Sequence, residues 1–269
     1  MLLQSNSSDF YTQCKKNISY KLTGDVAEIC APLFAKYPLN YFYYSRSYPD
    51  NCMLRVFSDL TWTDFYNKNC PFFITRESGI FLWETIFPKK VFQYATTHFN
   101  LYNGTSITKC CNDFVEYIGF ASANPEFHPI EFYCNQKDVF NKFYFYFKEK
   151  AAELIKKADK ERLMLPPQST LLISTTKNWQ QNKNSSEIDS KEFQPKKMSM
   201  HFKNGDVCFS PREFEVLSLL AEGYGMKQVA SELDICVRTA ETHLQRAKSK
   251  AQSYTTIQLL DDFRDNLFL

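Results

Sequence analysis

A run of hydrogen-bonding side chains lies near the C-terminal end of the sequence, in DICVRTAETHLQRAK (234–248). Apolar residues recur there at helical spacing, at Val237, Ala240, Leu244 and Ala247. The opposite face of the predicted helix carries Arg238, Glu241, Thr242, Gln245 and Lys248. An ordinary amphipathic helix with one face in water explains this pattern. The same side chains can also recognise a polar partner. The choice between these two interpretations depends on the residues that position the helix.

Two further helices are predicted just before this one. Ser210, Pro211 and Glu213 form a capping box with proline in the first turn, which predicts that a helix begins there. Gly223 and Gly225 allow that helix to end and turn. Its predicted buried stripe is Phe214, Leu217, Leu220 and Ala221, and that of the next helix is Met226, Val229, Ala230 and Leu233.

Short helices joined by a tight turn at 234–236 are typical of a helix-turn-helix. In that motif the second helix stands out from the body and enters the major groove of DNA. The polar face of 237–248 would then meet base edges and phosphates.

The segment from Ser210 to Lys250 closely resembles the DNA-binding domain of the LuxR-type transcription regulators. The family pattern runs [ST]-x-R-E-x-x-V-L-x-x-x-A-x-G, then [IV]-A-x-x-L, then T-V-x-x-H. The sequence matches at Pro211, Arg212, Glu213, Val216, Leu217, Ala221, Gly223, Lys227, Val229, Ala230, Leu233, Thr239 and His243. The resemblance covers the C-terminal end, and we expect residues 203–269 to form an all-α helix-turn-helix domain whose partner is double-stranded DNA.

The resemblance implies a role for each polar residue of this region. Base-edge contacts are implied for Glu241, Thr242 and Gln245. Phosphate contacts are implied for Lys227, Arg238, Thr239, Arg246 and Lys248. Phosphates repel a carboxylate, so we expect Glu241 either to accept from a cytosine amino group or to pair with Arg238 or Gln245.

The resemblance has two departures. Cys236 stands where the recognition helix usually opens with a serine cap, and it is a poorer acceptor, so the helix start is expected to be weaker. Ala240 is smaller than the usual apolar residue after Thr239.

The formal net charge of +2 gives no chain-wide attraction to nucleic acid, so basic charge must act locally. Four cations lie in 236–250 against Glu241: Arg238, Arg246, Lys248 and Lys250. We expect one copy to bind DNA weakly and a homodimer to bind better. The closing helix, 255–269, carries Ile257, Leu260, Phe263 and Leu267 on one side. This apolar side could form a dimer interface or pack in the core of its own domain.

With 269 residues and 44% hydrophobic content, the chain can bury at least one full core, and two domains are expected. The nine cysteines show no zinc-ligand spacing and are interpreted as reduced, mostly buried thiols. No leader pattern and no apolar run of membrane-spanning length occurs, so a cytoplasmic protein without membrane contact is expected.

Helix-like and strand-like patterns alternate over residues 1–165, which predicts an α+β domain with a central sheet. A helix is predicted at 25–37, a hairpin at 41–58, a short helix at 61–69, and two strands within 106–121. HPIEFYCN (128–135) fits a strand or a loop. A long helix is predicted at 138–163, with a seam that could pack on its own domain or on a twin helix. Pro166 and Pro167 end it, and residues 166–202 are predicted to be a linker.

The N-terminal domain is similar, more faintly, to the α/β/α sandwich that binds acyl-homoserine lactones in the quorum-sensing branch of the LuxR family. Trp62 and Tyr66 in WTDFY and Trp83 in GIFLWE match that pocket. Its aspartate, which accepts from the amide of the signal, is missing: Thr75 stands there, followed by Arg76 in place of proline. Without the carboxylate a buried amide donor would be poorly satisfied.

The pocket candidates are Tyr43, Tyr44, Trp62, Tyr66, Phe72 and Trp83. The ligand could be an acyl-homoserine lactone or another small molecule, and the domain could also bind none, since aromatics at such spacing also form plain core.

Catalysis is not indicated. His98 and His128 lie far from any paired nucleophile or carboxylate pattern, and the acidic residues of a phosphorylated receiver domain do not occur in order. We expect no enzyme activity, cofactor or metal. The sequence predicts a dimeric DNA-binding transcription regulator with a sensor-like domain. The alternative is a ligand-independent regulator or an interaction protein whose N-terminal domain binds a protein.

Overall fold

The computed structural model describes residues 8–70, 72–166, 170–172, 193, 195–202 and 204–267. The chain divides into two units: Met1–Phe140 with Lys150–Asp189, and Asn141–Glu149 with Ser190–Leu269. The second unit therefore takes in part of the helix that was predicted for the first domain. The boundaries 1–165, 166–202 and 203–269 stay a prediction.

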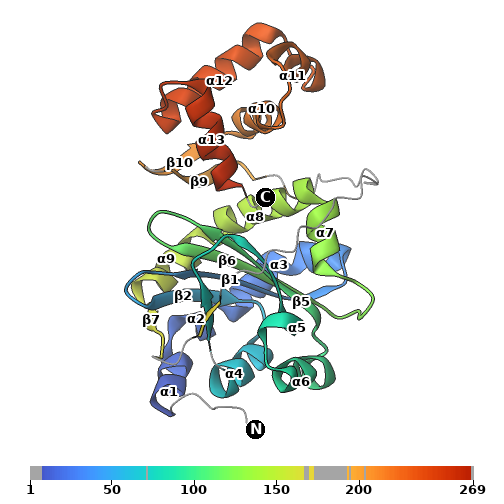
Figure 1. Cartoon of the computed structure of the whole chain (residues 1–269), viewed down its shortest axis with the longest axis vertical. Coiled ribbons are helices and arrows are strands. Elements are labelled where there is room, and N and C mark those ends of the chain that lie inside the picture. The colour runs from blue at the N-terminus through green and yellow to red at the C-terminus, as the bar shows by residue number, and fades with distance from the viewer. Residues whose placement is uncertain are drawn as a thin grey trace. The chain divides into compact units, whose positions relative to one another are not determined.

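A six-stranded sheet forms the centre of the first unit (Figure 1). Its order is β4 (Gly79–Leu82), β5 (Tyr102–Cys110), β6 (Val115–Ser122), β1 (Leu39–Ser47), β2 (Cys52–Phe57) and β7 (Leu163–Met164). All neighbouring strands are antiparallel. A separate pair, β3 (Phe73–Thr75) and β8 (Thr170–Leu172), is parallel. The predicted hairpin and the predicted strands within 106–121 are confirmed.

Helices lie on both faces of this sheet (Figure 1). They are α1 (Ser8–Lys16), α2 (Ile18–Lys21), α3 (Thr23–Lys36), α4 (Leu60–Asn69), α5 (Trp83–Ile86), α6 (Lys89–Phe99), α7 (Pro129–Asn135) and α9 (Ala152–Lys160). Helix α8 (Lys137–Lys150) is divided between the two units, because its residues 141–149 belong to the second. Helix α3 packs on β1 and β2 through Val26, Cys30 and Leu33. Helices α1, α4, α5 and α6 supply the cluster on the other face. The first unit is thus a mixed α/β structure, and the helices predicted at 25–37 and 61–69 are confirmed.

Two sequence predictions for this unit are wrong. Residues 129–135 are helical rather than strand or loop, because Pro129 occupies the first helical position and Glu131 follows in the first turn. The single helix predicted over 138–163 is two helices that meet at Ala151. The seam nevertheless turns inward: Phe140, Tyr144, Phe147, Ala151 and Ala158 are buried.

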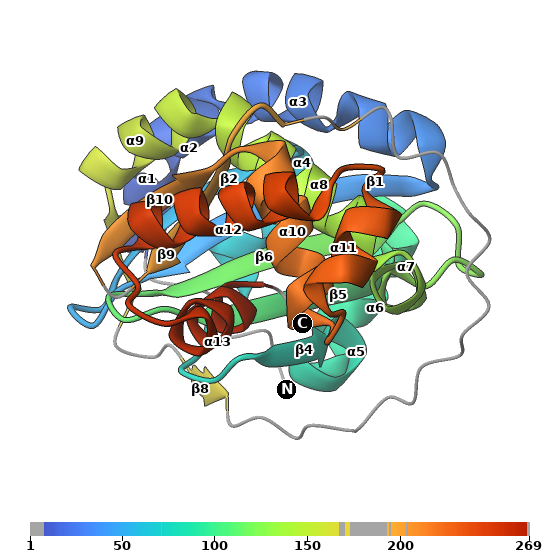
Figure 2. The same ribbon diagram turned by 90° about the horizontal axis from the view of Figure 1, so that it is seen from above.

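In the described part of the second unit, residues 141–149 of α8 join a hairpin and four further helices. These elements are β9 (Met198–Phe202), β10 (Gly205–Phe209), α10 (Pro211–Ala221), α11 (Met226–Glu232), α12 (Val237–Ala251) and α13 (Thr256–Asn266). Figure 2 shows β10 beside α12. The C-terminal region is helical, but with this hairpin it is not purely α, and β9 occupies part of the predicted linker.

Aromatic rings hold the second unit together. Phe214 packs on Phe263 with ring centroids 5.3 Å apart, and Phe209 lies 6.4 Å from the same ring. Phe145 of α8 also contacts Phe214, at 5.0 Å. Val216 and Leu217 are fully buried in α10, whereas the predicted stripe residues Leu220 and Ala221 are only half-buried.

The predicted start of α10 is confirmed. Ser210 Oγ accepts from the backbone N–H of Glu213, and the Glu213 carboxylate accepts from the N–H of Ser210. Lys250, at the end of α12, donates to the same carboxylate at 2.6 Å. Burial alone would raise the pKa of Glu213, but the hydrogen bonds from Lys250 and Ser210 outweigh it and lower that pKa below its usual value.

All nine cysteines are free. Only Cys14, Cys30 and Cys70 are buried, so the prediction that most are buried is wrong. Within the described ranges, no helix combines the length and the apolar character needed to cross a bilayer.

We expect Gly119→Ala to destabilise the first unit. A Cβ at Gly119 would overlap the ring of Tyr43 on the neighbouring strand, and overpacking of this kind costs roughly 1–3 kcal/mol. Gly24→Ala is the control, because nothing lies within 4 Å of its added Cβ. Urea unfolding measures both variants, and equal stability of the two would contradict the described packing.

We expect Lys250→Met to lower the free energy of unfolding of the second unit by roughly 1–2 kcal/mol at pH 7, because it leaves the buried Glu213 carboxylate without its cation; water screens part of the loss, since Lys250 is 42% exposed. A lowered carboxyl pKa stabilises the fold above the usual value of 4.5, and the contribution is lost as the pH falls below it. The difference from wild type should therefore shrink on acidification. Arg246→Met removes an exposed cation of the same helix and is the control for thermal melts.

Candidate functional site

Helix α12 has one buried face and one exposed face. Ala240, Leu244, Ala247 and Ala251 are buried against the rest of the unit. The exposed residues on the other side are Arg238, Glu241, Thr242, Gln245 and Arg246. Helices α10 and α11 both contact α12 and hold it in this orientation. The described unit thus presents the polar face that the sequence predicted, to solvent and without a covering element of its own.

The turn before α12 depends on unusual backbone angles. Gly223 adopts φ 97° after α10, and Asp234 adopts φ 51° between α11 and α12. Glycine reaches this left-handed region without steric cost, and aspartate tolerates it better than most side chains. These positions let two short helices follow one another closely.

The other predicted contact residues lie on α11 and α12. Lys227 is exposed at the start of α11, while Thr239 and Lys248 are half-buried on α12. The Thr242 hydroxyl donates to the backbone carbonyl of Arg238 at 2.8 Å, which leaves its oxygen able to accept. The structure therefore places seven of the eight predicted contact residues on α12, and the eighth, Lys227, at the start of α11.

Glu241 makes no hydrogen bond or ion pair with any residue in the described part of the chain, so it is paired with neither Arg238 nor Gln245. Its carboxylate is exposed among the cations of the face. The expected pair with Arg238 or Gln245 is therefore absent. The other expectation, that Glu241 accepts from a cytosine amino group, stays a prediction.

Lys250 does not belong to the exposed basic face, although the sequence counts it among the four local cations. Its ammonium group pairs with Glu213 at 2.6 Å. Arg238, Arg246 and Lys248 remain against Glu241, so the local positive charge available to a partner is smaller than predicted.

Cys236 caps α12 poorly, as expected. Its side chain makes no capping bond to the helix N–H groups, and its sulfur lies 3.0 Å from the Thr239 hydroxyl. Hydrogen bonding to Thr239 lowers the pKa of this thiol.

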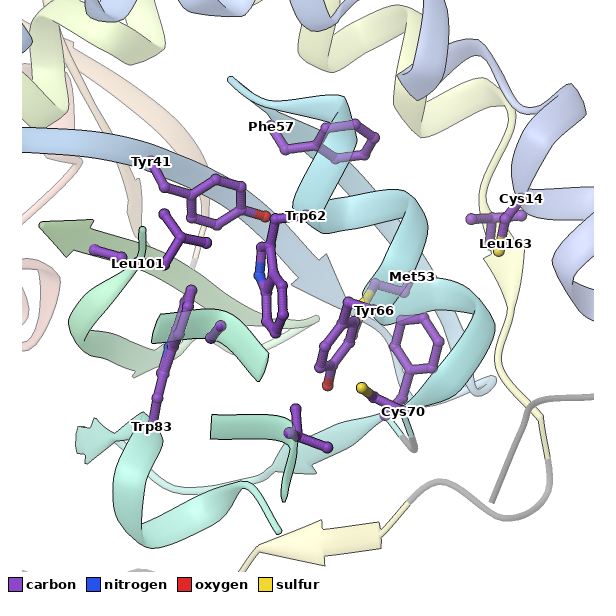
Figure 3. Close-up of a cluster of buried hydrophobic side chains, with 14 of the residues drawn as sticks. Cys14, Tyr41, Met53, Phe57, Trp62, Tyr66, Cys70, Trp83, Leu101 and Leu163 are labelled. Atoms are coloured by element: carbon purple, nitrogen blue, oxygen red, sulfur yellow. The ribbon is translucent and has the colours of Figure 1, made fainter. Parts of the chain in front are cut away.

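A second candidate site is a cavity of about 60 Å³ in the first unit. Predicted residues that line it are Tyr43, Trp62, Tyr66, Phe72 and Trp83. Figure 3 shows Tyr41, Trp62, Tyr66 and Trp83 converging from β1, α4 and α5. Trp62 stacks on Trp83 with centroids 5.9 Å apart. A volume of this size holds a few water molecules.

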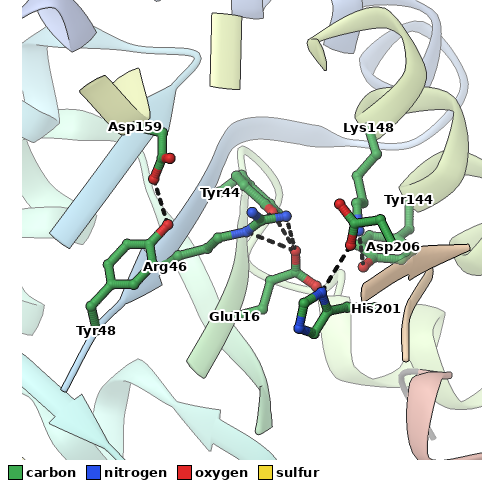
Figure 4. Close-up of polar contacts among 9 residues, drawn as sticks. All are labelled: Tyr44, Arg46, Tyr48, Glu116, Tyr144, Lys148, Asp159, His201 and Asp206. Atoms are coloured by element: carbon green, nitrogen blue, oxygen red, sulfur yellow. Dashed lines mark hydrogen bonds and ion pairs between the residues drawn. The ribbon is translucent and has the colours of Figure 1, made fainter. Parts of the chain in front are cut away.

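Tyr44, the remaining pocket candidate, does not line the cavity. Successive side chains of a strand point to opposite faces, so Tyr43 and Tyr44 of β1 cannot share one. The Tyr44 hydroxyl donates to the buried Glu116 carboxylate and accepts from Arg46 Nε at 2.7 Å (Figure 4). Tyr44 thus belongs to a structural network on the far side of the sheet.

Hydroxyl groups form the polar part of the cavity wall. Ser106 Oγ accepts from the Tyr43 hydroxyl at 2.8 Å and from the Trp83 indole N–H at 2.9 Å. The Tyr117 hydroxyl accepts from the Thr75 N–H at 3.0 Å and donates to the Thr75 carbonyl at 2.9 Å. Thr75, which stands where the sequence comparison expects aspartate, therefore does line the cavity but brings no carboxylate.

Burial keeps three phenols of this wall, those of Tyr41, Tyr43 and Tyr117, neutral. Burial raises the pKa of Tyr41 to about 12 and also raises the pKa of Tyr43 and of Tyr117. These groups are therefore neutral hydrogen-bonding groups at physiological pH.

Sequence reasoning missed several residues of the cavity, among them Tyr41, Arg55, Ser106 and Tyr117. A signal was present for two of them. Tyr41 lies two residues before Tyr43 and so faces the same way. Arg55 interrupts the apolar strand CMLRVF, where a charge needs an explanation. Ser106 and Tyr117 carry no such signal, because only the strand register brings them there.

Comparison with known proteins agrees with the geometry of the second unit. Residues 207–257 match the family described as bacterial regulatory proteins, luxR family. No curated protein matches the chain. Among solved structures, SdiA in complex with octanoyl-rac-glycerol has 13% identity and a TM-score of 0.36, covering 97% of this chain and 96% of that chain. Escherichia coli SdiA has 14% identity and a TM-score of 0.32, covering 97% of this chain and 100% of that one.

The family match ends within α13, and it includes the turn at Asp234 and the whole of α12. Residues 207–257 are therefore a helix-turn-helix domain of the luxR family of bacterial regulatory proteins.

Proposed function

We propose that this chain is a transcription regulator, not an enzyme, that reads double-stranded DNA with α12. The observation that carries the proposal is the uncovered polar face of α12 within a luxR-family domain. Glu241, Thr242 and Gln245 contact base edges, and Lys227, Arg238, Thr239, Arg246 and Lys248 contact phosphates.

The first unit, which we infer to be an α/β/α sandwich, acts as the sensor. Its cavity combines aromatic walls with a few hydroxyl groups, as small-molecule sites do. A ligand larger than a few waters must displace side chains, and Ile86 and Phe87 at the wall are only half-buried. A ligand that binds one conformation better shifts the population towards it.

The active species is a homodimer. Two large exposed side chains support this: Tyr254, just before α13, is 91% exposed, and Ile257, in its first turn, is 74% exposed. Phe263 of the same helix is buried within its own unit. Helix α13 thus serves core packing with one face and offers another to a second copy, whose α12 would reach the next half-site on the duplex.

We expect Gln245→Ala and Lys227→Ala to weaken DNA binding in different ways. Gln245→Ala removes a base contact and should relax sequence preference. Lys227→Ala removes a phosphate contact, so it should weaken binding to every duplex and flatten the dependence on salt. Fluorescence anisotropy on a selected operator and on random duplex, at several salt concentrations, measures both.

The wild-type protein also tests the proposal as a whole. Absence of any salt-dependent duplex binding would leave the alternative, an interaction protein whose first unit binds another protein. Identical behaviour of the two variants on both duplexes would overturn the division of roles.

We expect Ile257→Lys to shift the protein towards monomer, because a charge would have to be buried in the interface. Operator affinity should fall with it. Gln258→Lys adds the same charge at the neighbouring exposed position and should leave both unchanged. Sedimentation at several protein concentrations gives the result, and a monomeric wild type would refute the dimer.

A further inference from the structure

Arg55 is a charged side chain in the wall of the aromatic cavity. It lies in the middle of β2, opposite Ser45 of β1, and is 9% exposed. No other residue lining the cavity carries a formal charge, and all of these residues belong to the described part of the chain. A buried guanidinium is costly unless it is paired, so the partners of Arg55 need to be accounted for.

The hydrogen bonds of Arg55 use one corner of the guanidinium. Nη1 donates to Asn67 Oδ1 at 2.7 Å. No described residue accepts from Nε or from Nη2, the two nitrogens on the other edge of the group. The rings of Phe72 and Tyr66 flank it, with centroids 5.0 Å and 5.8 Å from Cζ. Aromatic faces stabilise a cation but supply no acceptor for those N–H groups.

A carboxylate is reached only through intermediates. Asn67 Nδ2 donates to the Tyr20 hydroxyl at 3.0 Å, and that hydroxyl donates to Asp64 at 3.2 Å. Asp64 therefore stands two side chains away from Arg55 and makes no direct ion pair with it. Burial keeps Tyr41, Tyr43 and Tyr117 of the cavity wall protonated, so none of these three phenols replaces the missing anion.

We propose that the cavity takes a ligand with a carboxylate group, seated on the Nε–Nη2 edge of Arg55, and with an apolar body among Trp62, Trp83 and Phe87. The free edge offers two parallel N–H donors, which match the two oxygens of a carboxylate. A single positive charge in an otherwise uncharged wall balances a monoanion and leaves a dianionic phosphate ester uncompensated. This inference rests on the proposed sensing role of the first unit.

The absence of an aspartate at Thr75 fits the same ligand class. A carboxylate in this wall would pair with Arg55 and would repel an anionic ligand. With threonine there, the wall keeps its positive charge for a ligand that brings the opposite one.

The wild-type protein tests the proposal without any substitution. Trp62 and Trp83 line the cavity, so intrinsic fluorescence reports its occupancy. Butanoate, hexanoate and octanoate are each titrated at pH 7 beside the primary amide of the same chain length, which is similar in shape but neutral. We expect the carboxylate of at least one chain length to bind at least tenfold more tightly than its amide.

Arg55→Met keeps the apolar stem and removes the charge. It should abolish the preference for the carboxylate while still binding the amide, and Arg76→Met, an exposed arginine outside the cavity, should behave as wild type. Should Arg55→Met fail to fold, the wild-type comparison decides alone.

The outcomes test the role of Arg55 and the sensing role of the first unit separately. Equal binding of carboxylates and amides to the wild type would overturn the role of Arg55 and leave the cavity as a sensor site for neutral molecules. Failure of every compound in both series to bind would overturn this inference together with the sensing role. Duplex binding by α12 is measured separately and is not affected by either outcome.

Discussion

The alternation of side chains along β1 and β2 is the constraint on which the first unit depends. Because a strand turns successive residues to opposite faces, Tyr41, Tyr43 and Ser45 reach the cavity with Met53 and Arg55. The intervening residues, such as Phe42 and Tyr44, face the other helical layer. A register shift of one residue would exchange these two sets and would bring Arg46 towards the cavity in place of its neighbours. The antiparallel pairing of β1 with both β2 and β6 prevents such a shift.

In the second unit, small side chains determine how α12 packs on its neighbours. Ala240, Ala247 and Ala251 form much of the buried face of α12, so its backbone approaches α10 and α11 closely. Because these buried residues are small, only a narrow face of the helix is buried. Long polar side chains can occupy the rest of its circumference. The ion pair between Lys250 and Glu213 fixes the far end of α12 to the first turn of α10. The helix is thus held at both ends while its polar face stays uncovered.

Local signals in the sequence predicted a large part of this architecture. The capping box at Ser210, the glycine after α10 and the alternating β1–β2 hairpin each depend on near neighbours in the chain, and each is found in the structure. Tyr44 faces away from the cavity because strand alternation, not aromatic character, decides which residues of β1 line it. Residues 129–135 are a short apolar run, which fits a strand and a helix alike. The proline at the helix start favours the helix. The partner of Lys250 and the isolation of Arg55 depend on contacts between distant segments, which no local pattern encodes.

Tyr43 and Gly119 face each other across β1 and β6, and the phenol ring occupies the space that a side chain at 119 would fill. Trp83 stands in the same relation to Gly104. In each pair the glycine leaves space for the ring opposite it, and a side chain placed at the glycine alone would overlap that ring. A larger side chain at either glycine position would need a smaller ring opposite it, so the effects of substitutions at the two positions of a pair are coupled. Because Tyr43 and Trp83 line the cavity, its shape would change through such paired substitutions.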